Sequence, residues 1–313
     1  MPVEKVSLEV VAARIAQSRN LQPSEATPDT LTQMSRELQQ SLAVVSVVVI
    51  PPDGGPSAAY LSSIATFSVL SEDELRQLLS QNRPVPIACT FDLLEAKAIE
   101  EKLRRDGIEV YVLGDDVLAP QQPPQRVRKL EFERDEIVLF PEVTVEAPKR
   151  IKTESIRLIV EGRIVRRQIE AREENKSFAR TERELVDVIE FVDQNSLADF
   201  YTDSPQSCFR VREESFDYSG LRGRMQLTAA ANFRLLIDML CEMARPVYDN
   251  TYRKASKLLD PLWPSTKRTE SLGVKRTSLS PGKVPTASRQ VIDNELQFNR
   301  YSRLGYKLLK MSL

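Results

Sequence analysis

The most restrictive feature of this sequence is one continuous apolar run, residues 42–50, with the sequence LAVVSVVVI. It is interrupted only by Ser46 and is ended by Pro51 and Pro52. A membrane-spanning helix needs about 20 apolar residues, so this run is too short to cross a bilayer. Its β-branched residues predict a strand. Because the apolar residues are continuous rather than alternating, we expect the strand to be central and covered on both faces.

Strands and helices alternate on both sides of this run. Residues 6–15 predict a strand and residues 27–41 a helix, so the order up to residue 50 is strand, helix, strand. Residues 85–113 repeat that order, with Gly107 as the residue that ends the helix. Two such units in tandem predict an α+β fold that begins with a ferredoxin-like (split β-α-β) domain over residues 1–118.

The second of these units carries a family resemblance. The motif Leu94-Glu95-Ala96 stands at the start of its helix, and Gly107-Ile108 stands before its second strand. On these motifs, residues 85–118 resemble the small prokaryotic signal-transducing protein domain, which has a PII-like, ferredoxin-like fold. The resemblance implies a regulatory or ligand-sensing domain, and it carries over no catalytic residue.

The pattern changes over residues 127–245, where several strands are predicted between polar turns. The turns at residues 193–196 and 203–206 each predict a hairpin. A long amphipathic helix capped by Thr228 follows. Antiparallel strands closed by one such helix resemble the pleckstrin-homology-like (PH-like) layout, and an open α+β sheet packed by one helix is the alternative. Residues 119–126, with three prolines, predict a linker before this domain.

The last part of the chain, residues 246–313, predicts a basic tail. Counted from Arg245, it holds fourteen basic and five acidic residues, a net charge of +9, which leaves −10 for residues 1–244. Residues 247–259 predict a short helix. Residues 266–290 contain few large apolar side chains and predict a mobile or extended segment.

Aromatic and cationic side chains alternate near the end of this tail. The candidate interaction residues there are Arg300, Tyr301, Arg303 and Tyr306. This composition suits base stacking combined with phosphate contacts, as in nucleic-acid binding. It also suits intramolecular docking onto the acidic remainder of the chain, which the opposite charges of the two parts favour slightly, or contact with a protein partner. The sequence leaves these three alternatives open.

Several classes of chemistry are excluded by absent residue types. The chain has no histidine, which excludes Ser-His-Asp and Cys-His pairs and the histidine-containing zinc sites. Its ten glycines form no phosphate-binding motif. The cysteines Cys89, Cys208 and Cys241 are too few for a disulfide framework, so we expect buried thiols in a reducing, cytoplasmic setting. We therefore predict no catalytic residue, no cofactor and no resident metal.

Three further groups of residues are candidate binding sites. Asp115 and Asp116 follow a predicted strand and could hold a hard cation, although solvated carboxylates are the simpler interpretation. Asp217 and Tyr218 could line a pocket or, more simply, close the end of a sheet. A basic patch that could contact phosphates or be solvated comprises Arg163, Arg166 and Arg167.

Taken together, these observations favour a non-enzymatic, cytoplasmic regulatory or protein-interaction protein that acts in signal transduction or as a scaffold. The alternative is a nucleic-acid-binding protein that uses the basic tail. A weaker alternative is an enzyme in which carboxylates such as Asp115 hold a metal ion.

Overall fold

The computed structural model describes residues 44–119, 123–141, 148–177, 180–204, 208–274 and 286–311. The strand expected at residues 6–15 and the helix expected at residues 27–41 lie outside these ranges. Residues Val45–Leu313 form one compact unit, and the chain is α+β.

The apolar run forms the central strand of a small sheet. Strands β1 (Val45–Val49), β2 (Val85–Thr90) and β3 (Val110–Gly114) pair in the order β2-β1-β3, with β1 antiparallel to both neighbours. Every residue of β1 is buried, as the sequence predicted for a central strand. Helix α5 (Leu93–Arg105) connects β2 to β3, and Gly107 follows it with a φ of +76°. The described sheet has three strands, which does not confirm a complete ferredoxin-like fold.

Side-chain caps define the helices around this sheet. Ser71 and Glu74 form the predicted capping box of α4 (Glu72–Leu79), and Asp92 caps α5 by accepting a hydrogen bond from the Leu94 N–H. Two shorter helices, α3 (Ala58–Ala65) and α6 (Asp115–Leu118), complete this half of the unit. Each cap satisfies amide groups that a helix leaves unpaired at its start.

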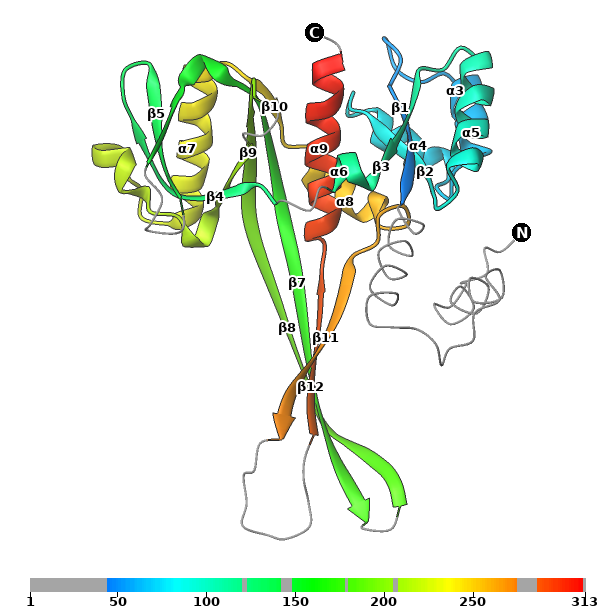
Figure 1. Cartoon of the computed structure of the whole chain (residues 1–313), viewed down its shortest axis with the longest axis vertical. Helices are drawn as coiled ribbons and strands as arrows, with labels where there is room; N and C mark the ends of the chain where they lie inside the picture. Colours follow the sequence, from blue (N-terminus) through cyan, green and yellow to red (C-terminus); the bar gives the residue numbers. More distant parts are fainter. Residues whose placement is uncertain are drawn as a thin grey trace, which may run out of the picture. The chain divides into compact units, whose positions relative to one another are not determined.

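The larger sheet has nine strands. They are β4 (Gln125–Phe132), β5 (Glu136–Pro141), β6 (Lys149–Lys152), β7 (Ile156–Ser177), β8 (Arg180–Thr202), β9 (Cys208–Arg212), β10 (Val247–Asp249), β11 (Thr266–Val274) and β12 (Thr286–Asp293). Their order is β11-β12-β7-β8-β9-β4-β5-β6, with β10 pairing β7 in parallel. This path has two ends, at β11 and β6, and it does not confirm a PH-like barrel. Figure 1 shows β7, β8, β11 and β12 extending together beyond the helices.

One expectation for this sheet is wrong. No turn occurs at residues 193–196, because β8 runs straight through them, with Gln194 opposite Val165 and Asn195 opposite Ile164 of β7. The long β7–β8 ladder continues through these residues, which outweighs the local turn preference. The segment 266–290, expected to be mobile or extended, is extended in its described residues, which form β11 and most of β12. The turn expected at residues 203–206 does lie between two antiparallel strands, β8 and β9.

Three helices pack against the larger sheet. Helix α7 (Ala229–Ala244) begins at the predicted cap Thr228. Its buried face packs on β4, β5, the start of β7, the end of β8 and β9. The helix expected at residues 247–259 is divided, because its first residues form β10 and only α8 (Tyr252–Leu259) is helical. The chain ends with α9 (Glu295–Met311), a helix of 17 residues that the sequence did not predict.

The small sheet and the C-terminal helices share one hydrophobic core. This core joins β1, β2, β3, α3, α4 and α5 to α8, α9 and parts of β7 and β8. Trp263 is fully buried in it, and its indole N–H donates to Ser46 Oγ on β1 at 3.0 Å. Residues of the expected first domain and of the expected basic tail are therefore packed together.

A close backbone approach fixes the segment between β9 and α7. In the 3-10 segment Tyr218–Arg224, a Cβ added at Gly220 would lie 1.8 Å from the carbonyl oxygen of Leu130 on β4. A Cβ at Gly223, three residues further on, would meet nothing within 4 Å. The segment can therefore lie against β4 only because residue 220 has no side chain.

We predict that Gly220→Ala lowers the free energy of unfolding by about 3 kcal/mol, because a backbone oxygen cannot move aside as a side chain can. Gly223→Ala is the matched control and should change it by less than about 0.5 kcal/mol. Urea denaturation of the two variants and the parent protein measures both values. Equal stability of the two variants would contradict the close approach at Gly220.

Candidate protein-interaction surface

The aromatic and cationic residues of the tail lie inside the molecule. Arg300 makes a two-point ion pair with Asp115, at 2.9 and 2.6 Å. The buried Tyr301 hydroxyl donates to Asp249 Oδ2 at 2.9 Å. The part of the tail that forms α9 is therefore docked on the rest of the chain. The rings of its tyrosines are covered rather than open to stack on bases.

The other two tail candidates surround one tyrosine of β8. Tyr306 is buried, stacks on Tyr201 with ring centroids 4.5 Å apart, and donates its hydroxyl to the Thr202 carbonyl at 2.9 Å. The Arg303 guanidinium lies 5.7 Å from the centroid of the same Tyr201 ring. Both residues hold α9 on the larger sheet.

A buried ion pair lies beneath α9. Arg210 of β9 contacts both carboxylate oxygens of Asp199 of β8, at 2.7 and 2.8 Å, and both side chains are almost fully buried. Burial acts to lower the pKa of Arg210, but the charge of Asp199 and its hydrogen bonds outweigh burial, so that pKa is raised above its ordinary value. The guanidinium therefore stays charged inside the protein.

Helix α9 satisfies the remaining hydrogen bonds of this pair. Ser302 Oγ donates to Asp199 Oδ2 at 2.9 Å. The Arg210 guanidinium also donates to Glu295 Oε1 at 3.0 Å and to Asn299 Oδ1 at 2.6 Å. The ion pair consequently fixes where α9 lies on β8 and β9.

Asp217 and Tyr218 lie beside β4, where the Asp217 N–H donates to the Arg128 carbonyl at 2.6 Å. The Asp217 carboxylate accepts from the Ser219 N–H at 2.9 Å, which lowers the pKa of Asp217 below its usual range. Tyr218 is buried, with its hydroxyl donating to the Glu213 carbonyl at 2.9 Å and its ring set edge-on to Phe216. These contacts give both residues a structural part in the fold.

Of the three cysteines expected to be buried, Cys208 is buried, and Cys89 and Cys241 are half-buried. Burial raises the pKa of Cys89, Cys208 and Cys241, so the three thiols are protonated at neutral pH. Asp115 is engaged by Arg300, and no group of three or more metal-ligating side chains occurs among the described residues. The chemistry of these side chains is hydrogen bonding and packing.

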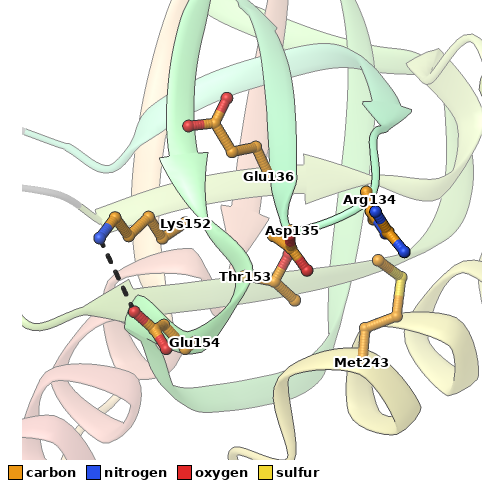
Figure 2. A pocket seen from close by; sticks show the side chains of 7 residues that line it. All are labelled: Arg134, Asp135, Glu136, Lys152, Thr153, Glu154 and Met243. Carbon is orange, nitrogen blue, oxygen red and sulfur yellow. Dashed lines mark ion pairs between the residues drawn. The ribbon is translucent and has the colours of Figure 1, made fainter.

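A polar recess of about 510 Å³ lies where the β4–β5 turn, the end of β6 and the last turn of α7 meet (Figure 2). It is lined by Arg134, Asp135, Glu136, Lys152, Thr153, Glu154 and Met243. Thr153 Oγ1 is buried and has no hydrogen-bond partner among the described residues. Charges of both signs line the recess.

The described surface carries an apolar strip on β8. Its members are Val188, Ile189, Phe191 and Val192, each between 43% and 54% exposed. Strand β9 pairs with β8 only from Leu197 to Tyr201, so the strip lies on a part of β8 that has β7 on one side. The sequence predicted a strand here but gave no signal that its apolar side chains are exposed.

The basic patch lies on the neighbouring strand β7. Arg167 is opposite Val192 and Arg166 is opposite Asp193 of β8, and both arginines are exposed. Arg163 donates to the Gln194 side chain at 3.2 Å. Arg166 therefore has an acidic residue opposite it, and because successive residues of a strand point to opposite faces, Arg166 and Arg167 do not share one face of the sheet.

Comparisons of the chain with protein-family models, curated proteins and solved structures return no match. Within the described ranges, none of the helices is long and apolar enough to cross a membrane.

We predict that Asp199→Ala and Arg210→Ala each lower the free energy of unfolding by about 3–5 kcal/mol, because either change leaves one charge buried without its partner. The double variant should lose less than the sum of the two single losses. Urea denaturation of all three measures these values. The exposed pair Arg157–Asp203 provides the control, where Arg157→Ala should cost less than about 1 kcal/mol. An Arg210→Ala loss no larger than that of the control would contradict this assignment.

Proposed function

We propose that this chain is a non-enzymatic regulatory or scaffold protein that works by binding another protein. The observation that carries the proposal is the apolar strip of β8, where four large side chains in a run of five residues are exposed. Exposed apolar patches on a folded surface are characteristic of interaction sites. A cytoplasmic setting and a part in signal transduction, as the resemblance of residues 85–118 implies, belong to the same proposal.

The strip is favoured over two other groups of exposed apolar side chains. Phe91, Leu93 and Leu94 surround the start of α5, and Met225 and Leu227 lie in the segment before α7. Those groups lie on a helix or a loop, where the backbone offers no continuous row of hydrogen-bonding groups. The β8 strip combines exposed side chains with a strand backbone, so one partner can contact both.

The buried tail supports a protein partner over nucleic acid. Base stacking needs exposed ring faces. Tyr301 and Tyr306 are both buried, and Arg300 is paired to Asp115. In the nucleic-acid alternative, Tyr301 and Tyr306 are therefore not open for base stacking.

The test is nuclease-treated affinity purification from the native host, read by mass spectrometry. The variant carries Val188→Thr, Ile189→Thr, Phe191→Thr and Val192→Thr, because threonine is polar yet β-branched and therefore favours the strand. The control variant carries Met225→Thr and Leu227→Thr. We expect a stoichiometric protein partner with the parent chain and the control, and at least about tenfold less with the β8 variant.

Two results would contradict the proposal. One is a partner that all three proteins capture equally, which would place the interaction elsewhere. The other is nucleic acid alone co-purifying before nuclease treatment, with no protein partner captured by any of the three.

A further inference from the structure

The apolar strip has a free backbone edge beside it, and this edge indicates how a partner binds. We infer that the occupant is an extended segment of a partner protein, rich in basic and apolar residues, that adds to β8 as a further strand. This inference rests on the proposed function, because it names the kind of partner that the strip takes.

One edge of β8 is open where β9 no longer pairs with it. Strand β9 stops pairing with β8 at Leu197, and in the described sheet β8 continues from there with β7 as its one neighbour. Figure 1 shows β8 running on beside β7 past the end of β9. An edge of this kind presents N–H and C=O groups that another strand can pair with.

The second step is the arrangement of the side chains. Successive residues of a strand point to opposite faces, so Val188 and Val192 share one face while Ile189 and Phe191 share the other. All four are exposed. A strand added at this edge would gain apolar contacts on both of its faces, and cross-strand contacts of this kind stabilise strand pairing.

The third step is the contrast with the two ends of the sheet. The end strand β6 carries Lys149, Arg150 and Lys152, and the end strand β11 carries Lys267 and Arg268. Charged side chains, lysine above all, are how proteins keep an edge strand from pairing with other chains. The strip on β8 has four apolar residues in five positions and no basic residue, so it lacks the basic side chains that the two end strands carry.

The fourth step is the charge of the edge. Residues 180–196 hold two basic and five acidic residues, a net charge of −3; Glu190 lies within the strip, and Asp187 and Asp193 flank it in the sequence. Opposite charges on neighbouring strands attract, and like charges directly opposite repel. A basic segment is therefore favoured. A second copy of this chain would bring two strands of net −3 together and is disfavoured.

The experiment uses the full chain and three short synthetic peptides. The first alternates lysine and valine, the second replaces each lysine by glutamate, and the third is the lysine–valine peptide with N-methyl groups on alternate backbone nitrogens. The third keeps the charge and side chains but cannot pair along one edge. Fluorescence anisotropy measures binding, and NMR hydrogen exchange follows the amides of residues 188–192.

We expect the lysine–valine peptide to bind about tenfold more tightly than either of the other two. Its affinity should fall as salt concentration rises. Exchange should slow at alternate amides of residues 188–192, since every second N–H faces the open edge. Equal binding of the lysine–valine and N-methylated peptides, or no binding of either, would overturn strand addition.

Two further readouts separate this inference from the proposed function. A captured partner that depends on the β8 strip, together with equal binding of the two lysine peptides, would overturn strand addition and leave the proposed function standing. Sedimentation equilibrium of the full chain tests the second copy. A dimer that the four threonine substitutions dissociate would overturn the basic partner, because the occupant would then be the chain itself.

Discussion

The buried pair of Arg210 and Asp199 is the interaction on which the rest of this structure depends. Two charges can remain in a protein interior only if nearly all of their hydrogen-bonding groups are satisfied. Ser302, Glu295 and Asn299 supply those partners, and all three belong to α9. The helix is therefore placed by the chemistry of the pair as well as by its apolar face. Through Arg300 and Asp115, the same helix is tied to α6 beside the small sheet. One helix thus joins the two sheets of the unit.

Local signals in the sequence predicted much of the fold. The apolar run forms β1, Ser71 and Thr228 cap helices, and Gly107 ends the α5 turn with positive φ. These features depend on residues close in sequence, so the sequence alone reveals them. Helix α9 was missed because its residues mix aromatic, cationic and polar side chains, and it contains Gly305. Contacts to β7, β8 and α6 stabilise it, and those partners are distant in sequence. The missed continuity of β8 through residues 193–196 has the same cause.

The candidate site shows the same division between local and distant information. The sequence singled out Tyr301 and Tyr306 as candidate interaction residues and left open whether they contact a partner or dock within the chain, and the structure buries both. Their hydroxyls find Asp249 and the Thr202 carbonyl, partners that only the fold brings within reach. On β8 the sequence predicted a strand but not the exposure of its apolar side chains, because the neighbouring strand β9 pairs only as far as residue 197. Sequence shows which side chains can make a contact, whereas exposure depends on where other strands stop.

The acidic residues of β8 give the inferred edge two consistent properties. A free strand edge with exposed apolar side chains is a hazard for any protein, because identical copies can pair through it. Asp187, Glu190 and Asp193 oppose that pairing, since each copy presents the same negative strand. The same three charges favour a basic segment over other extended chains. They therefore disfavour a second copy of this chain and favour a basic segment of a partner protein. The ladder with β7 and the helix α9, itself held by Arg210 and Asp199, keep this strand in place while the edge stays open.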